Sequence, residues 1–173
     1  MKKSVISLLV SISLWVSFSF AQQQTSQWPQ WKEYVFAEDG FALTLPEDPR
    51  PHPDASIPDM TVYTVVVPPH GNLSLRVSHQ YRDCAATLAQ LRDDALKGKA
   101  GTDPASVKDV SVAGHLGLEY QFTGSTWTGW DRYYCVSGRF YTFSTQWPRS
   151  DARPPAAMRI VSSFRLIKAE SYR

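Results

Sequence analysis

The sequence predicts an α+β fold, a mainly antiparallel sheet of about six to eight strands flanked by helices on both faces. The predicted elements run in the order four strands, a helix, four strands and a second helix. Links of hairpin length within each set of strands favour antiparallel pairing over a doubly wound parallel sheet. The hairpin at 131–147 carries aromatic residues on both of its faces, so both faces need cover: Tyr133 and Phe140 on one, and Tyr134, Tyr141 and Phe143 on the other.

The first four strands are predicted at residues 31–36, 41–45, 60–67 and 73–81. An Asp39-Gly40 turn separates the first two, since Asp-Gly is a strong hairpin signal. The fourth strand alternates most clearly, because apolar residues occupy every second position from Leu73. Between the second and third strands, segment 46–58 contains five prolines. Proline lacks the backbone donor that strand pairing needs, so this segment is predicted to be a loop.

A helix is predicted at 83–97, with Asp83 as its N-cap and glycines at its end. The strands that follow are expected at 107–112, 116–123, 131–136 and 139–147, and residues 124–129 are expected to form a loop. Ala113-Gly114 and Ser137-Gly138 are the predicted turns. A last helix begins near Asp151. The two helices present these apolar faces: Cys84, Leu88, Leu91 and Ala95 in the first, and Ala157, Ile160, Val161 and Phe164 in the second.

Residues 1–21 have the layout of a secretory signal peptide. Two lysines precede an uncharged apolar stretch, and Ser19-Phe20-Ala21 supplies the small residues that a signal peptidase requires. An uncleaved membrane anchor is the alternative, but the stretch is shorter than the ~20 residues that cross a bilayer. We therefore expect cleavage after Ala21 and export to a periplasm or the cell exterior. The mature chain then comprises a flexible lead-in at 22–30, a single domain at 31–167 and a C-terminal tail at 168–173.

The mature chain is expected to be electrically neutral. The full sequence has 18 lysines and arginines against 16 aspartates and glutamates, and the signal peptide removes Lys2 and Lys3. Without a net positive field, the chain is not expected to bind nucleic acid. No second apolar run approaches membrane length, so the product is expected to be soluble, with no stable membrane insertion.

Cys84 and Cys135 are the only cysteines. In an oxidising compartment, an even number of cysteines favours a structural disulfide between them. Two alternatives stay open: two separately buried thiols, or a reactive thiol at Cys84 activated by the dipole of its helix. No C-x-x-C spacing supports redox catalysis.

The sequence predicts no metal site, no cofactor and no catalytic residues. His52, His70, His79 and His115 lack the spacing of metal ligands. His79 falls on the apolar side of its strand, where a hydrogen-bonded core or strand-end histidine is expected rather than a metal ligand. The pair Glu38-Asp39 is read as part of a turn. Since no nucleophile elbow or phosphate-binding loop is present, an enzyme is less expected than a binding protein.

Short motifs of the chain resemble the PsbP-like superfamily. They are Gly40-Phe41-Ala42-Leu43-Thr44-Leu45-Pro46 after Trp31-Lys32-Glu33-Tyr34, the turn and strand from Gly114 to Tyr120, and Arg139-Phe140-Tyr141 followed by Ser163-Phe164-Arg165-Leu166. The superfamily is named for an extrinsic subunit of photosystem II and includes a Ran-binding protein of nuclear transport. The chain is most similar to its uncharacterised secreted bacterial members. The resemblance implies an antiparallel sheet between helices, and a function in binding proteins rather than in catalysis.

Trp127 and Trp130 are the candidate binding residues, because they flank the expected loop at 124–129. Exposed aromatic rings there would receive a protein partner or stack on sugar rings. The alternative is that the aromatic residues of this region fill the core. The sequence therefore predicts an exported, non-catalytic module that binds another exported protein. A module for a glycan or small ligand is the second hypothesis, and a hydrolase or thiol enzyme is the third.

Overall fold

A computed structural model describes residues 30–167 apart from 55–56, 58, 69 and 80. The predicted signal peptide, nearly all of the lead-in and the tail at 168–173 lie outside these described residues. Within them, no helix is long and apolar enough to cross a membrane.

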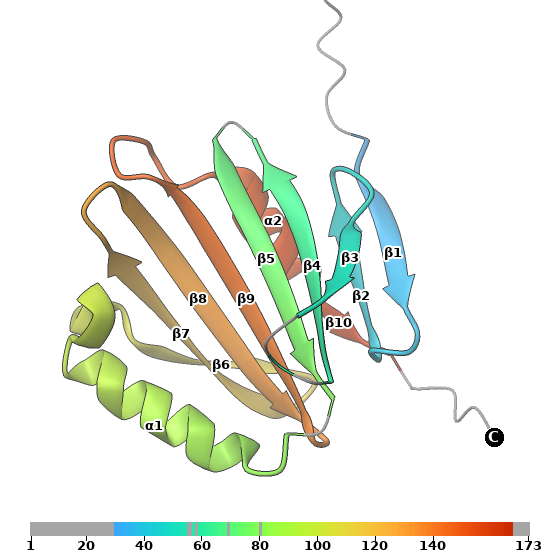
Figure 1. Ribbon diagram of the computed structural model, residues 1–173, viewed down its shortest axis with the longest axis horizontal. Helices are drawn as coiled ribbons and strands as arrows, with labels where there is room; N and C mark the ends of the chain where they lie inside the picture. The colour runs from blue at the N-terminus through green and yellow to red at the C-terminus, as the bar shows by residue number, and fades with distance from the viewer. Residues whose placement is uncertain (1–29, 55–56, 58, 69, 80, 168–173) are drawn as a thin grey trace, which may run out of the picture.

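The described chain contains one large antiparallel sheet of seven strands, in the order β3-β4-β5-β9-β8-β7-β6. Strand β9 therefore lies at the centre and joins the strands that precede α1 to those that follow it (Figure 1). The strands are β3 (Arg50–Pro53), β4 (Met60–Val67), β5 (Gly71–Ser78), β6 (Lys108–Val112), β7 (His115–Thr123), β8 (Trp127–Val136) and β9 (Arg139–Pro148).

A second sheet, which the sequence analysis does not predict, has three strands among the described residues. It pairs β1 (Lys32–Phe36) and the two-residue β10 (Arg165–Leu166) with opposite edges of β2 (Phe41–Leu45). Helix α2 (Pro155–Ser162) packs on β2, and the hydroxyl of Ser163 accepts a hydrogen bond from the Thr44 amide at 2.8 Å. The first and last described strands therefore belong to one small layer.

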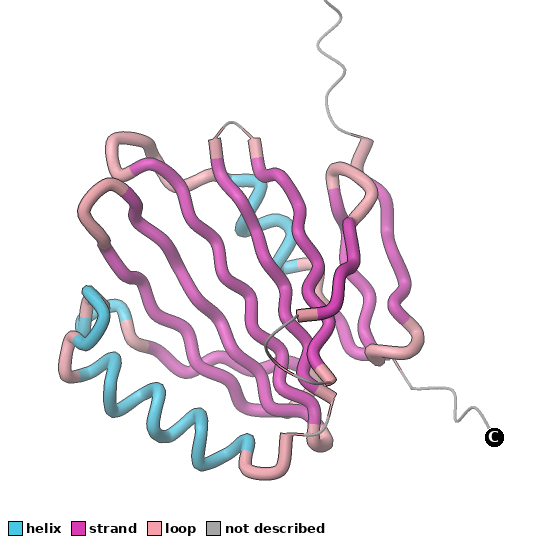
Figure 2. Tube along the Cα trace, viewed as in Figure 1, coloured by secondary structure: helices cyan, strands magenta, loops and turns pink. Residues whose placement is uncertain are grey.

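Helices lie on both faces of the large sheet, as predicted (Figure 2). Helix α1 (Cys84–Leu96) contacts β7 and β8 on one face. The small sheet and α2 cover the opposite face, where most of the core lies. Two short 3-10 turns, η1 (Lys99–Gly101) and η2 (Pro104–Ser106), lead from α1 to β6. Large buried residues of the main core include Phe41, Leu75, Trp130, Tyr141, Phe143 and Ile160; those beneath α1 include Leu118, Tyr120, Tyr133 and Phe140.

The prediction that segment 46–58 is entirely a loop is wrong, because residues 50–53 form β3. Pro51 and Pro53 pair with Tyr63 and Thr61 of β4. Backbone N–H groups alternate in direction along a strand, so the two prolines share one direction. At the edge of a sheet that direction can face solvent, and the missing donors then cost no pairing.

The predicted loop at 124–129 is also wrong from Trp127 onward, where β8 begins. Gly129 caused the error, since it reads as a loop residue in the sequence. In the structure Gly129 pairs with Phe122 of β7 and Gln146 of β9. A Cβ atom at this position would clash with the Phe122 ring. The glycine is therefore a site of close packing within a strand and not a turn.

The predicted turns are confirmed, whereas the predicted cap of α1 is only half correct. Ala113-Gly114 and Ser137-Gly138 both have positive φ, as two-residue hairpin turns require. Asp83 occupies the N-cap position of α1, but its side chain makes no capping hydrogen bond. The amide of Thr87 instead donates to the Asp83 carbonyl at 3.0 Å.

Candidate functional site

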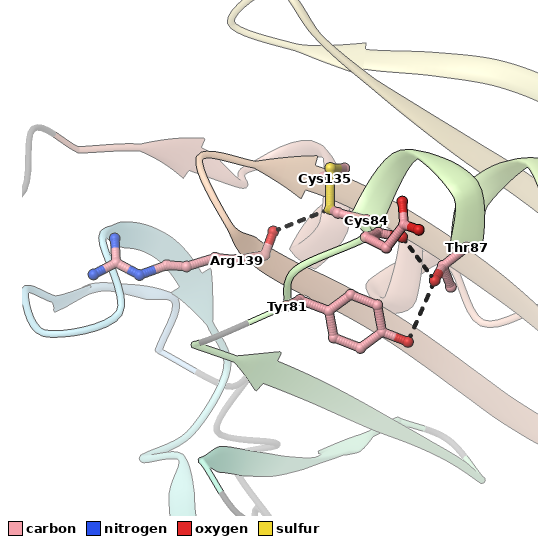
Figure 3. Close-up of a disulfide and its surroundings, with 6 residues drawn as sticks. Tyr81, Cys84, Thr87, Cys135 and Arg139 are labelled. Carbon is pink, nitrogen blue, oxygen red and sulfur yellow. Dashed lines mark hydrogen bonds between the residues drawn. A yellow bond between two sulfur atoms is a disulfide. The ribbon is translucent and has the colours of Figure 1, made fainter.

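The predicted disulfide between Cys84 and Cys135 is present. Its Cα atoms are 5.6 Å apart and its S–S distance is 2.01 Å. The bond joins the first residue of α1 to β8 across 51 positions of sequence (Figure 3). Because both sulfurs are bonded, the alternatives of two buried thiols or a reactive thiol do not apply to this state.

Neighbouring side chains hold the same end of α1 against the sheet. The ring of Tyr81 stacks on Phe140, with centroids 4.9 Å apart. The hydroxyl of Thr87 lies 3.0 Å from the Asp83 carbonyl oxygen and 3.5 Å from the Tyr81 hydroxyl (Figure 3). The start of the helix is thus fixed by a covalent bond, a ring contact and polar contacts.

An apolar groove runs between α1 and the β6–β7 hairpin. Its volume is about 590 Å³. Leu116 stands at the groove with 72% of its surface exposed, the largest value among the exposed large apolar residues described. An ion pair between Arg92 and Asp109 lies at the edge. We name this the α1 groove; it is lined by Ala85, Leu88, Ala89, Arg92, Asp109, Gly114, His115, Leu116, Gly117, Leu118 and Cys135.

Trp127 and Trp130 do not share one surface, contrary to the sequence prediction. Side chains alternate along β8, so the two indoles project from opposite faces of the sheet. Trp130 has no exposed surface, and the guanidinium groups of Arg132 and Arg153 lie 4.8 and 5.0 Å from the centroid of its ring. Trp127 is 45% exposed. Only Trp127 is therefore available to a partner.

A buried ion-pair cluster lies beside Trp130. The side chain of Glu119 is 3% exposed and accepts hydrogen bonds from Lys108 at 2.7 Å and from Arg132 Nε at 2.7 Å. Burial alone would raise the pKa of Glu119, but the hydrogen bonds from Lys108 and Arg132 lower it below its usual value. Glu119 is thus a charged, fully paired carboxylate, and we assign it a structural role.

The face of the large sheet on which α1 packs also has a polar region that the helix does not cover. It spans β4, β5 and β9 and contains a shallow pocket of about 170 Å³. The strand register sets its side chains in adjacent rows, with Thr64, Ser74 and Ser144 in one row and Asn72 beside Gln146 in the next. We name this region the open face; it consists of Thr64, Asn72, Ser74, Arg76, Thr142, Ser144 and Gln146.

Asp131 lies on β8, directly across from Ser144 of the open face. Its Oδ2 accepts a hydrogen bond from the Tyr133 hydroxyl at 3.0 Å, and the Tyr133 and Tyr120 hydroxyls are 2.8 Å apart. Its Oδ1 is buried without a hydrogen-bond partner among the described residues. Burial raises the pKa of Asp131, while hydrogen bonding and the charge of Arg76 oppose the rise. Sequence reasoning missed this residue, because an aspartate within a strand has no motif around it.

Asp39 lies in a turn, as predicted, and is a buried polar centre. Its Oδ1 lies 2.8 Å from Nε2 of His79, its Oδ2 accepts from the Tyr63 hydroxyl, and its carbonyl accepts from the Tyr141 hydroxyl at 2.7 Å. These contacts join the β1–β2 turn to the large sheet. They also confirm the strand-end alternative for His79, which lies just after β5 and is hydrogen-bonded. Among the described residues, no hydroxyl or thiol bonds the His79 ring, so the pair serves here as a clamp between the two sheets.

The remaining histidines lie apart from one another. His52 is on β3, His70 lies 3.0 Å from Asp151, and His115 opens β7. In the part of the chain that the structure describes, no three His, Cys, Asp or Glu side chains are grouped to hold a metal ion.

Comparisons with known proteins address the fold. No protein-family model matches the sequence, and no curated protein does. The structure is similar to the solution structure of cyanobacterial PsbP (CyanoP) from Synechocystis sp. PCC 6803, with a TM-score of 0.54 and 14% identity over 78% of this chain and 91% of that one.

A crystal structure from Bacteroides thetaiotaomicron VPI-5482 is similar over 80% of this chain, with a TM-score of 0.50 and 14% identity. The match covers 49% of that protein, so the chain spans about half of its length. Likeness at this identity describes architecture and not activity. The seven-stranded antiparallel sheet, the small sheet and the two helix layers give this chain the PsbP-like fold.

Proposed function

We propose that the protein is an exported, non-catalytic interaction module that binds a second exported protein through the α1 groove. The observation that carries the proposal is the exposed Leu116 beside an apolar groove large enough to receive side chains of a partner. A concave apolar site of this size is typical of binding surfaces. The signal-peptide pattern and the disulfide support the exported compartment.

The groove has the layout of a protein interface. Its floor is formed by leucine and alanine side chains of α1 and β7, and its edge carries the Arg92–Asp109 ion pair and His115. An apolar centre with a polar rim is the usual anatomy of such interfaces. The disulfide at Cys135 holds one wall to the other, so binding would not need to order the helix first. The resemblance to a superfamily of protein-binding members agrees with this function.

Trp127 does not belong to this site. It lies at the start of β8, whereas the groove meets the sheet near Cys135 at the opposite end of that strand. The predicted partner surface therefore moves from the two tryptophans to Leu116 and its neighbours.

Site-specific photo-crosslinking in the producing cells tests the proposal. A benzophenone amino acid replaces Leu116 in one variant and Val35 in the other. Val35 is the matched control, because it is 59% exposed and apolar but lies on β1, outside the groove. We expect one exported protein to crosslink at position 116 and not at position 35.

The purified partner then serves in a binding titration. Leu116→Lys should weaken binding by about tenfold or more, as loss of a central apolar contact does, and should leave the melting temperature unchanged. Val35→Lys should bind as the parent does. Equal crosslinking at both positions, or unchanged affinity of Leu116→Lys, would overturn the proposal.

A further inference from the structure

We infer that the open face is a second binding site, which takes a neutral oligosaccharide with one sugar ring in the pocket between β5 and β9 and another ring on Trp127. This site is independent of the α1 groove. The groove lies where α1 meets β6 and β7, whereas the pocket lies over β4, β5 and β9.

The first support is the chemistry of the side chains in the pocket. Asn72 and Gln146 present amides, and Thr64 and Ser74 present hydroxyls; within the described chain none of these four side chains has a hydrogen-bond partner. Amides and hydroxyls both donate and accept, as the hydroxyl groups of a sugar do. Their rows are set by the strand register, so the donors and acceptors are held in place before a ligand arrives.

The second support is the unpartnered carboxylate oxygen beside the pocket. A buried acceptor atom without a donor costs about 1–3 kcal/mol. Oδ1 of Asp131 is such an acceptor, one strand away from the pocket residue Ser144. A ligand hydroxyl that donates to Oδ1, in competition with the nearby Ser144 hydroxyl, would recover this cost on binding.

The third support is the charge of the face. Arg76 supplies one positive charge, and Asp131 supplies one negative charge that lies close enough to interact with it. The two offset each other, so neither an anionic nor a cationic ligand is favoured over a neutral one. The remaining side chains of the open face are uncharged.

The fourth support is the position of Trp127. It projects from the same face of β8 as Gly129, and Gly129 pairs with Gln146 of the pocket. With strands about 4.8 Å apart and residues about 3.4 Å apart, the backbone at Trp127 is roughly 8 Å from Gln146. A trisaccharide is long enough to bridge this separation. The exposed indole offers an apolar ring surface on which the second sugar can stack.

An NMR titration of the oxidised protein tests the inference. The probes are three neutral trisaccharides (maltotriose, cellotriose and N,N′,N″-triacetylchitotriose), with trigalacturonate and chitosan trimer as anionic and cationic counterparts. We expect at least one neutral trisaccharide to shift the backbone amides of 72–76 and 142–146 and the indole N–H of Trp127. The glucose monomer should bind more weakly than its trimer, since it lacks the ring on Trp127.

Variants on the two faces of the sheet show which face binds the sugar. Asn72→Ala and Trp127→Ala should each weaken binding by about fivefold or more, the loss of one hydrogen bond or one stacking contact. Gln121→Ala is the control, because this exposed amide projects from the opposite face. The inference is overturned if no neutral trisaccharide shifts the open face, if only a charged trimer does, or if Gln121→Ala weakens binding as strongly as Asn72→Ala. None of these outcomes bears on crosslinking at Leu116.

Discussion

At the scale of single residues, Trp127 and Trp130 have different roles. Trp127 is a candidate binding residue, whereas Trp130 stabilises the fold. They have the same side chain and lie on the same strand, but one is 45% exposed and the other has no exposed surface. Trp130 packs in the main core, and the guanidinium groups of two arginines contact its ring.

Truncating the two tryptophans should therefore have unequal effects on the free energy of unfolding. Trp130→Ala should lose about 3–5 kcal/mol, because it removes a large core side chain and leaves a cavity. Trp127→Ala should change stability by less than about 0.5 kcal/mol, as exposed positions do. Urea unfolding followed by circular dichroism measures both. Similar losses for the two variants would contradict the burial that we describe.

Two carboxylates of neighbouring strands have pKa values shifted in opposite directions. The pKa of Glu119 is lowered, since its hydrogen bonds to Lys108 and Arg132 outweigh burial. The pKa of Asp131 is raised, since burial outweighs its hydrogen bonds and the charge of Arg76. Glu119 thus stabilises the fold when it is ionised, whereas ionised Asp131 destabilises it.

Replacing each acid by its amide should show these opposite signs. Glu119→Gln should destabilise the protein at pH 7 by about 2 kcal/mol or more, because two cations lose their partner, and the loss should shrink as the pH falls below the unfolded value of about 4.3. Asp131→Asn should stabilise the protein at pH 7, and the gain should vanish below about pH 4, where the unfolded aspartate is also protonated. Urea midpoints at pH 7 and pH 3.5 measure both effects. A stabilised Asp131→Asn variant that also binds sugar more weakly would show that the aspartate is retained for the ligand.

At the scale of elements, α1 depends on its anchoring more than on its own apolar face. Only Cys84 and Ala95 of the helix are fully buried. Its N-cap side chain makes no capping bond, so the helix lacks the usual local stabilisation at that end. The disulfide and the stacked Tyr81 ring compensate there.

Removing the disulfide should consequently loosen α1 before it affects the main core. The double variant Cys84→Ala/Cys135→Ala should lose about 2–4 kcal/mol of stability, the usual value for a native crosslink. Amide exchange should accelerate most at residues 84–96. Dithiothreitol should reproduce the loss in the parent protein and have no effect on the double variant. An unchanged urea midpoint in the double variant would mean that the crosslink stabilises nothing.

The sequence predicted some elements of the fold correctly and others wrongly, and the difference has a physical cause. Alternation and turn signals sufficed for β4, β5 and the β8–β9 hairpin, because their information is local. The errors occurred where a residue type has two uses. Prolines usually exclude strands but are compatible with the edge position of β3, and Gly129 serves ring packing instead of a turn.

For the whole molecule, the antiparallel sheet with helices on both faces followed from the sequence, but the second sheet did not. Strand β10 has only two residues, and its pairing with β2 joins opposite ends of the domain. The clamp at Asp39, the unpartnered Asp131 and the α1 groove likewise depend on residues brought together from distant strands. The disulfide was predictable, because two cysteines in an oxidising compartment have one possible pairing within the chain.

The central place of β9 in the large sheet has a consequence for how the chain folds. Strands β3 to β5 precede α1 and form one half-sheet, and strands β6 to β8 form the other. The two are separate until β9 (Arg139–Pro148) pairs with β5 and β8. Each half-sheet on its own presents an unpaired inner edge and much of its apolar surface to water. The core is complete only when this strand, late in the sequence, has paired on both of its sides. Its contacts join residues that are distant in the sequence, and such contacts make folding slow.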